Sequence, residues 1–406
     1  MKITNLESMI MELENVHSLK REDIEKIQLK KLNEVLKKEH ERQGFYKHLP
    51  ERLSDLKELE NLPFTTAEDL RENSASMLLL SQSRVERVLT EQSSGTTGEP
   101  KRLYYTAGDL ENTVRLFMAG LGEFVFSGSV TYIAMPFSGP NGLGELIAEA
   151  IERLGAKPIK AGPFLSVGEI REVFEREKPD TYVGMPGNLL FILRTLGKMS
   201  LERALVSGDA SPKCVEKSCE EILRTRLFPH YGSREMALGG AVTCPAHEGM
   251  HLRENHVIAE IVDEKGNTVP QGEWGELVIT TIGMEAMPLI RYKTGDYTRI
   301  LPYNCPCGSE ILRLDELKRM EYPDIFRLEE TLFSLPQICD FIAERKDDEI
   351  SLKCLVNDHI QIKEIEHSAQ NAMPNVKFNV EILSVDDATK PLCPGKRKIE
   401  QESSRS

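Results

Sequence analysis

The sequence predicts a mixed α/β protein with a β-rich subdomain and a small α+β domain at its C-terminal end. Short apolar runs alternate with amphipathic segments between residues 110 and 230, which is typical of βαβ units. Two β-prone runs flank a Gly/Pro turn between residues 256 and 300, and this pattern indicates hairpins. We therefore expect a large multi-subdomain N-terminal domain over residues 1–315, with the β subdomain at about 240–310, and a small domain over residues 316–406.

Length and composition agree with this division. At roughly 150 residues per domain, 406 residues suggest two to three domains that can each bury a core. The chain is 40% hydrophobic and 29% charged, which is typical of a globular protein and excludes a disordered one. Its net charge of −14 repels polyanions, so we expect neither a nucleic acid nor an anionic membrane as partner.

The first residues indicate the cell compartment. Glu7 and Glu12 interrupt any apolar run near the start, so we expect no secretory signal. No run of about 18 apolar residues is present, which excludes a transmembrane helix on sequence grounds. We therefore expect a cytoplasmic protein whose 8 cysteines are thiols or metal ligands.

In chain order, the first predicted elements surround a polar loop. Leucines recur at helical spacing within residues 24–42, which predicts an amphipathic helix. Residues 84–90 alternate and residues 102–106 are β-prone, so we expect two strands with a Ser/Thr/Gly loop between them.

The middle of the chain predicts strands and helices in alternation. We expect strands at 130–136, 181–185 and 204–207 and a helix at 143–154. Ser166 and Glu169 form a capping-box pattern that predicts a helix over residues 167–176.

Further strands and a helix complete the chain. Strands at 256–262 and 276–282 belong to the predicted β subdomain, with Pro270 and Gly272 in the turn between them. In the C-terminal domain, alternation at 350–354 and 376–382 predicts strands, and residues 362–373 predict a helix.

The loop after the first predicted strand has the composition of an oligophosphate site. Its glycines allow backbone N–H groups to face anionic oxygens, its hydroxyls donate further hydrogen bonds, and its lysine adds a point charge. The residues are Ser93, Ser94, Gly95, Thr96, Thr97, Gly98 and Lys101. The alternative is a flexible Ser/Gly linker.

Two further clusters follow predicted strands. In the segment 230–235, which comes after an apolar run where we expect a strand to end at Phe228, Tyr231 can stack on a base and Glu235 can hold Mg²⁺. In the segment 291–296, Asp296 is an acceptor-only carboxylate suited to ribose hydroxyls. For each cluster taken alone, a structural turn is the alternative.

Four residues have the composition of a closed structural zinc site, with a Cys-x-Cys pair facing a Cys-x6-His pair. They are Cys244, His251, Cys305 and Cys307. His247 and His256 are alternative ligands, and unlinked buried thiols are the alternative to a metal site.

The three clusters, in this order and at these separations, resemble the adenylate-forming (acyl-CoA synthetase) superfamily. The segments 41–46 (ERQGFY), 285–292 (EAMPLIRY) and 305–308 (CPCG) are similar to its phenylacetate-CoA ligase branch and to related synthetases that adenylylate a deazaflavin coenzyme. The resemblance implies an adenylating domain, a C-terminal lid, and an AMP-forming ligase that activates a carboxylic acid with ATP and transfers it to CoA.

The resemblance also implies roles for individual residues. Ser93 to Lys101 would grip the ATP phosphates, Tyr231 would lie against adenine, Glu235 would bind Mg²⁺ and Asp296 would hold the ribose. Four further nucleotide-binding candidates are Gly208, Asp209, Gly232 and Ser233.

The reacting groups and the acid pocket are also implied. Lys396 would neutralise charge as the carboxylate attacks the α-phosphate, and Lys398 is a rival for this role. Tyr132, Phe137 and Gly139 fall where relatives line the acyl pocket, which suits a modest carboxylic acid, with an aromatic one favoured.

Three departures from the family pattern leave other functions open. Arg234 stands where a hydroxyl residue is usual, Glu99 adds negative charge to the phosphate loop, and residues 314–326 lack the glycine-containing hinge. A slower lid rotation is expected because Pro323 has a fixed φ. The alternatives are an adenylyltransferase that uses a coenzyme hydroxyl or protein thiol as acceptor, and a non-catalytic nucleotide sensor; a homodimer is possible in each case.

Overall fold

The computed structural model describes residues 3–91, 100–319, 323–385, 390–393 and 395–401. The chain forms two compact units, of which the first contains residues 1–123 and 229–317 and the second contains residues 124–228 and 318–406. Among the described residues, the helices are too short or too polar to cross a membrane. The sequence analysis expects a domain boundary near residue 315, with a lid after it that moves separately. This boundary stays a prediction.

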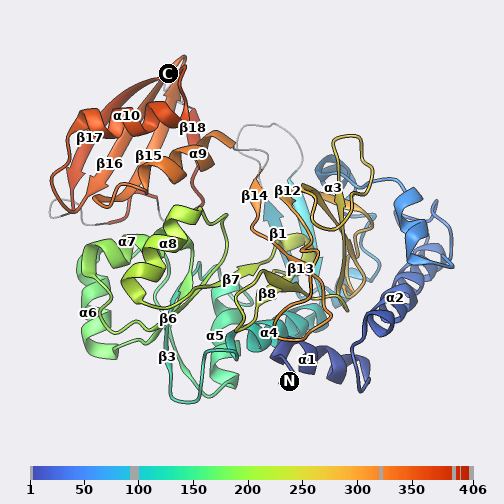
Figure 1. Ribbon diagram of the computed structural model, residues 1–406. Helices are drawn as coiled ribbons and strands as arrows, with labels where there is room; N and C mark the ends of the chain where they lie inside the picture. Colours follow the sequence, from blue (N-terminus) through green and yellow to red (C-terminus); the bar gives the residue numbers. More distant parts are fainter. Residues whose placement is uncertain (1–2, 92–99, 320–322, 386–389, 394, 402–406) are drawn as a thin grey trace. The chain divides into compact units, whose positions relative to one another are not determined.

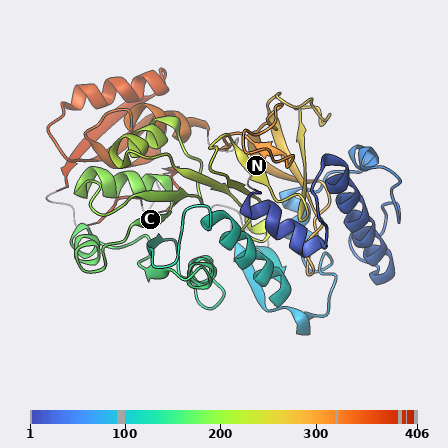
Figure 2. The ribbon, with the colours of Figure 1, turned by 60° about the horizontal axis from the view of Figure 1, so that its bottom comes forward.

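The first unit begins with helices that cover its β structure. The capping box of Thr4 and Glu7 starts α1 (Asn5–Glu14), which packs beside α4 (Ala107–Leu121) (Figure 2). Helix α2 (Arg21–Arg42) confirms the predicted amphipathic helix, and its buried leucines join a core that reaches Ile258 and Ile290. The remaining helical segments of this unit are α3 (Ala67–Asn73) and the 3₁₀ turns η1 (Leu56–Asn61), η2 (Gln82–Arg84) and η3 (Arg234–Met236).

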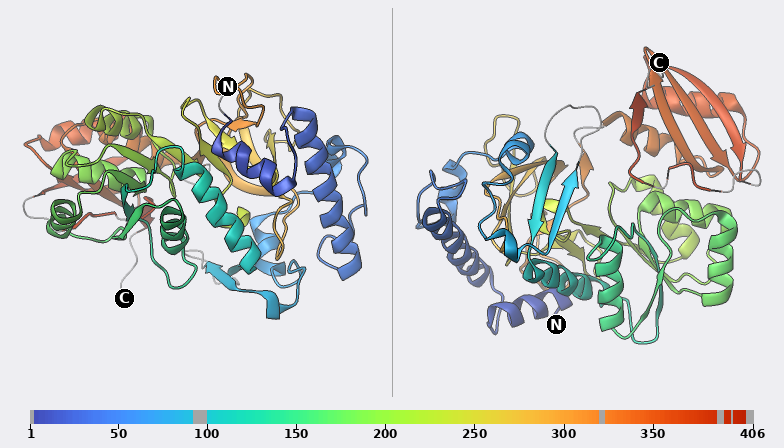
Figure 3. Two further views of the ribbon diagram at one scale, coloured as in Figure 1. Left: turned by 90° about the horizontal axis from the view of Figure 1, so that it is seen from below. Right: turned by 180° about the vertical axis from the view of Figure 1, so that it is seen from behind.

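Three groups of strands make up the rest of the first unit. The antiparallel pair β1 (Arg87–Glu91) and β2 (Lys101–Tyr105) confirms the two strands predicted around the polar loop (Figure 3). The antiparallel order β10–β11–β12 confirms the predicted hairpins. Their bounds are β10 (Val257–Val262), β11 (Gly275–Thr281) and β12 (Tyr292–Thr298).

A further antiparallel series corrects one boundary of the sequence analysis. Its order is β13 (Arg313–Leu314), β9 (Met250–Leu252), β8 (Ala241–Thr243) and β7 (Phe228–Tyr231). The expectation that a strand ends at Phe228 is wrong, because β7 begins there and Tyr231 is still paired with Ala241. The cluster 230–235 therefore starts inside a strand.

The second unit contains the predicted βαβ region. Its parallel strands lie in the order β6–β5–β3–β4, with helices arranged around them (Figure 1). Ser166 and Glu169 form the predicted capping box at the start of α6. The bounds are β3 (Val130–Ala134), α5 (Leu143–Arg153), β4 (Lys157–Lys160), α6 (Val167–Glu177), β5 (Thr181–Gly184), α7 (Pro186–Leu196), β6 (Arg203–Val206) and α8 (Lys213–Leu223).

The C-terminal part of the second unit confirms the predicted small α+β structure. Its sheet has the order β17–β16–β15–β18, and α10 lies along one face (Figure 2). Pro323 is the first residue of α9, where a fixed φ suits a helix start. The bounds are β14 (Lys318–Arg319), α9 (Pro323–Leu332), β15 (Ile338–Lys346), β16 (Glu349–Val356), α10 (Ile362–Ala372), β17 (Lys377–Ser384) and β18 (Ile399–Gln401).

The two segments of the second unit share one hydrophobic core and cap each other's helices. Arg194 of α7 donates hydrogen bonds to the carbonyl oxygens of Phe333 (2.8 Å) and Leu335 (3.0 Å), just after the end of α9. Glu330 of α9 accepts a hydrogen bond of 2.6 Å from the backbone N–H of Lys213, the first residue of α8. These contacts satisfy backbone groups that a helix end leaves unpaired. The predicted fold class, mixed α/β with a β subdomain, is confirmed.

Candidate functional site

The predicted phosphate loop lies mostly outside the described residues. This applies to Ser93, Ser94, Gly95, Thr96, Thr97 and Gly98, whereas Lys101 is described as the first residue of β2. Glu91 and Lys101 face each other in the β1–β2 register. The ends of the loop are therefore held together by a strand pair, and Lys101 projects from its base.

Lys101 lies in a cluster with Glu235 and Tyr292, which we call the Lys101 cluster. The Lys101 ammonium forms an ion pair with the Glu235 carboxylate. The Tyr292 hydroxyl is 3.2 Å from Lys101 Nζ and 3.2 Å from Glu235 Oε1. Burial would raise the pKa of Glu235, but Lys101 outweighs this effect and the pKa is lower than usual. Glu235 is thus a carboxylate that is kept ionised at the base of the loop.

A second tyrosine–carboxylate pair joins the same two segments of the chain. Tyr231 donates a hydrogen bond of 2.8 Å to Asp296 Oδ2. Burial and the neighbouring Asp296 carboxylate raise the pKa of Tyr231, so the phenol stays protonated and remains a donor. The nucleotide-binding candidates Tyr231 and Asp296, predicted from separate clusters, therefore lie together in the structure.

Local backbone geometry explains how Asp296 is presented. The pairing of β12 with β11 is irregular, because Glu276 faces Tyr297 whereas Val278 faces Lys293. The extra residues form a bulge in which Gly295 has a φ of 75°, a conformation that favours glycine. Asp296 follows this glycine directly, so the Thr-Gly-Asp sequence places a carboxylate on the bulge.

Gly232 and Ser233 connect Tyr231 to Glu235. A Cβ atom on Gly232 would come within 2.1 Å of the Leu238 carbonyl oxygen, so only glycine fits there. Ser233 precedes η3, which contains Glu235. The backbone carbonyl of Arg234 accepts a hydrogen bond of 2.6 Å from the Tyr105 hydroxyl, which fixes this turn to β2.

The second unit brings together two other groups of predicted residues. Gly208 and Asp209 follow β6, and Asp209 Oδ2 accepts a hydrogen bond of 3.3 Å from the backbone N–H of Arg397. Lys396, the residue next to Arg397, is exposed. The candidate catalytic lysine is therefore tied through its neighbour to the Asp209 turn.

Sequence reasoning missed the residues that hold Arg397. Its guanidinium forms ion pairs with Glu329 (3.0 Å) and with Asp340, and its Nε donates to the Phe341 carbonyl (3.0 Å). We call Arg397, Glu329 and Asp340 the Arg397 cluster. A signal was available in β15, where Asp340 stands among apolar residues, and such a carboxylate indicates a buried partner. Glu329 lies among other charged residues of α9, so no comparable signal was available there.

The three acyl-pocket candidates have different surroundings. Tyr132 is buried in the core, and its ring stacks on Tyr182 with centroids 6.3 Å apart. The ring of Phe137 packs against Gly144, where a Cβ atom would approach to 2.8 Å, while Gly139 is exposed. The role of these residues in acid binding stays a prediction.

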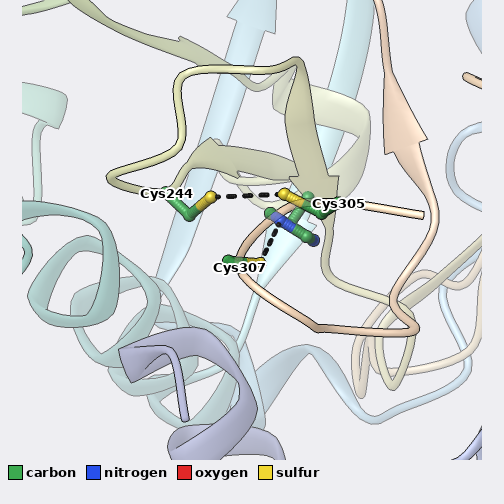
Figure 4. Close-up of side chains that lie close together, drawn as sticks. Cys244, Cys305 and Cys307 are labelled. Atoms are coloured by element: carbon green, nitrogen blue, oxygen red, sulfur yellow. Dashed lines mark hydrogen bonds between the residues drawn. The ribbon is translucent and has the colours of Figure 1, made fainter. Parts of the chain in front are cut away.

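The four predicted zinc ligands converge in the first unit and form the Cys/His cluster, of which Figure 4 labels the three cysteines. Cys244 follows β8 and His251 lies in β9, whereas Cys305 and Cys307 lie in a turn closed by a 2.9 Å hydrogen bond from Gly308 N–H to the Cys305 carbonyl. Their ligand atoms, three sulfurs and one nitrogen, all lie within 4.8 Å of one another.

The distances in this cluster fit a tetrahedral metal site. With Zn–S bonds of about 2.3 Å and Zn–N bonds of about 2.0 Å, tetrahedral geometry separates two sulfurs by roughly 3.8 Å and a sulfur from a nitrogen by roughly 3.5 Å. The Cys244 and Cys305 sulfurs are 3.7 Å apart, and Cys307 Sγ is 3.4 Å from His251 Nε2. Neither alternative ligand, His247 or His256, belongs to the four-residue group found among the described residues.

The chain belongs to the AMP-binding enzyme family, whose model matches residues 53–286. It is 26% identical over 379 residues to a phenylacetate-coenzyme A ligase of Thermus thermophilus, and the match covers 84% of each protein. A phenylacetate-coenzyme A ligase of Escherichia coli K12 is 29% identical over 315 residues, covering 71% of this chain and 70% of that one. The predicted resemblance to the adenylate-forming superfamily and its phenylacetate-CoA ligase branch is confirmed.

Solved structures show the same fold. The structure of a 2-hydroxyisobutyryl-CoA ligase in the postadenylation state aligns with a TM-score of 0.76 at 19% identity, over 93% of this chain and 90% of that one. The thioesterification state of that ligase aligns with a TM-score of 0.67, over 95% and 91% of the two chains.

Proposed function

We propose that this protein is an AMP-forming carboxylate–CoA ligase of the phenylacetate-CoA ligase type. The observation that carries the proposal is the pair of tyrosine–carboxylate contacts, Tyr292 to Glu235 and Tyr231 to Asp296, at the base of the predicted phosphate loop. A nucleotide needs an aromatic face, acceptors for ribose hydroxyls and positive charge near its phosphates. The tyrosines and carboxylates supply the first two, and Lys101, which is paired with Glu235, supplies the third. The named relatives support CoA as the acceptor.

In the proposed first step, a carboxylate oxygen attacks the α-phosphorus of ATP and pyrophosphate leaves. Asp296 accepts hydrogen bonds from the ribose hydroxyls, and Tyr231 lies against the adenine. Lys101 turns from Glu235 toward the phosphates and stabilises their charge. Mg²⁺, when bound at Glu235, supplies charge neutralisation on the phosphate oxygens.

Lys396 is proposed to stabilise the charge that develops as the carboxylate attacks. Its exposure and its fixed neighbour Arg397 suit a side chain that reaches a substrate from a held backbone. The segment 316–406 then turns. In the second step the CoA thiol attacks the acyl adenylate, and AMP leaves. An aromatic acid substrate, a homodimer and a cytoplasmic location also stay predictions.

The Cys/His cluster is proposed to hold a structural zinc ion. Four ligands leave no open coordination position, so the metal would stabilise the fold without taking part in the reaction. Removing Cys305 and Cys307 together with Ala substitutions should remove one zinc per chain and lower the melting temperature. One zinc per chain persisting in this double variant would contradict the site.

A pyrophosphate-release screen tests the main proposal. Aryl and short aliphatic acids are offered with ATP and Mg²⁺, with and without CoA. We expect pyrophosphate release that depends on the acid, and thioester formation that depends on CoA. Pyrophosphate without thioester would favour the adenylyltransferase, and ATP binding without pyrophosphate release would favour the sensor.

The lysine assignment has its own test. Lys396→Ala should lower acid-dependent pyrophosphate release by roughly 10² or more, the scale of a lost electrostatic contact in the transition state. Conversion of presupplied acyl adenylate to thioester should survive. Lys398→Ala is the matched control, and loss of release in that variant alone would move the role to Lys398.

A further inference from the structure

The proposed function uses the contact of Tyr292 with Glu235 but gives the Tyr292 hydroxyl no role of its own in the reaction. The Tyr292 ring is buried, with 3% exposed, and its hydroxyl lies between the two charged groups of the Lys101 cluster. The Lys101 ammonium also lies 5.5 Å from the centre of this ring. Tyr292 therefore contacts both the lysine of the phosphate loop and the carboxylate proposed to bind Mg²⁺.

The chemistry of the three groups fixes the direction of the hydrogen bonds. An ammonium can only donate, so the Tyr292 oxygen accepts from Lys101. The phenol has one proton, and an ionised carboxylate can only accept, so this proton points to Glu235 Oε1. The chain of donors runs from lysine through tyrosine to glutamate.

The backbone around Tyr292 is held from several sides. Arg291 donates its N–H to Thr280 Oγ1 (2.9 Å), and its buried guanidinium is paired with Glu260 (2.9 Å). On the other side, Lys293 donates its N–H to the Thr65 carbonyl (2.9 Å). The hydroxyl therefore stays in place when a mobile side chain such as that of Lys101 moves.

We propose that Tyr292 is a positioning residue that orients Glu235 for Mg²⁺ while Lys101 exchanges between Glu235 and the ATP phosphates. This inference rests on the proposed function. Both contacts described for the carboxylate in this cluster go to Oε1. When Lys101 moves to the phosphates, Tyr292 still donates to Oε1 and keeps the Glu235 carboxylate oriented for Mg²⁺. Without the hydroxyl, Oε1 of Glu235 loses the second of the two donors described for it once Lys101 has moved.

Tyr292→Phe removes one oxygen atom and keeps the buried ring, so the variant should fold and melt near the wild-type temperature. We expect the Mg²⁺ concentration for half-maximal pyrophosphate release, at saturating ATP and acid, to rise roughly tenfold, the scale of a lost hydrogen bond to a charged group. The maximal rate at saturating Mg²⁺ should change less. A structural role alone would not produce this separation.

Tyr297→Phe is the matched control, since Tyr297 lies in the same strand and its ring stacks on Trp274. Its Mg²⁺ curve should superimpose on the wild-type curve. A Tyr292→Phe curve that superimposes on the wild type, or a rate that falls equally at every Mg²⁺ concentration, would overturn the inference. Mg²⁺-dependent ATP binding to the wild type and to Tyr292→Phe is measured separately by calorimetric titration, and the variant should need more Mg²⁺. No binding to the wild type would overturn the proposed function, whereas binding that is the same in the wild type and in Tyr292→Phe would overturn this inference alone.

Discussion

The first unit holds the partly buried Lys101 and the second holds the buried Arg397, and these two cations are bound in different ways. Lys101, the first residue of β2, contacts the Glu235 carboxylate and the Tyr292 hydroxyl, and its ammonium lies 5.5 Å from the centre of the Tyr292 ring. Arg397 contacts two carboxylates and a backbone carbonyl, and its guanidinium lies 4.9 Å and 4.7 Å from the ring centres of Phe333 and Phe341. Of the ion pairs described, one holds Lys101 and two hold Arg397.

The chemistry of the two side chains fits this difference. Lysine is a point charge on a flexible stem, so it can leave one anion for another at low cost. The planar guanidinium of arginine has several directed donors, and losing any of its partners would leave a buried charge unpaired. We conclude that the Lys101 cluster suits a lysine that changes its anionic partner during the reaction. The Arg397 cluster suits an arginine that keeps its partners throughout.

The largest expected effect is on the permanent cluster. Arg397→Met should lower the free energy of unfolding by about 3–5 kcal/mol, because it leaves the Glu329 and Asp340 carboxylates buried without their cation. Urea unfolding checks this value. Arg176→Met is the control, since Arg176 is exposed and its midpoint should not move. A small loss of unfolding free energy in Arg397→Met would show that the Arg397 cluster does not stabilise the C-terminal part of the second unit.

The second expected effect separates the two clusters by function. Lys101→Met should weaken ATP binding roughly 10- to 100-fold, as expected for a lost charge-assisted hydrogen bond. Its unfolding midpoint should fall less than that of Arg397→Met, because one buried carboxylate loses its cation and not two, and Tyr292 still donates to it. Calorimetric titration with Mg²⁺-ATP measures the affinity. Lys353→Met, which removes a half-exposed lysine paired with Glu381, should bind ATP like the wild type. Unchanged ATP affinity in Lys101→Met would contradict the proposal that Lys101 moves from Glu235 to the ATP phosphates.

The smallest expected effect is a pH dependence in the Arg397 cluster. Burial raises the pKa of Glu329 from 4.5 to about 7, although Arg397 opposes the shift. The folded protein therefore binds a proton more readily than the unfolded chain between these values, and this group lowers stability as the pH rises from about 4.5 to 7.

Glu329→Gln should remove that fall. Relative to the wild type, the variant should become more stable at pH 8 than at pH 5 by roughly 2 kcal/mol, which urea unfolding at both pH values can measure. A difference between variant and wild type that is the same at both pH values would contradict the shifted pKa.

Local patterns predicted much of the fold. The capping box at Ser166 and the alternation in 350–354 depend on neighbours in sequence, and both were confirmed. The end of β7 was wrong because Tyr231 is polar, and its pairing with Ala241 cannot be read from the strand itself. In the site, Tyr231 and Asp296 were predicted singly, whereas their contact spans 65 positions of the chain.

Contacts between distant positions explain the missed residues too. Tyr292 lay inside a quoted motif, but its role depends on Lys101, which is 191 positions earlier. Arg397 reaches Glu329 across 68 positions and Asp340 across 57. Such pairs follow from the packing of whole elements, which hydrophobic periodicity alone does not specify.

The hydrogen bonds that Arg194 and Glu330 make at helix ends in the second unit have a kinetic consequence. If the segment 316–406 turns between the two half-reactions, the Arg194 bonds to Phe333 and Leu335 and the Glu330 bond to Lys213 must be given to water in every turnover. Breaking several directed hydrogen bonds before water replaces them adds to the enthalpy of activation of this step. Thioester formation is then expected to slow more steeply on cooling than pyrophosphate release, because the contacts at these helix ends limit the rate of the second half-reaction.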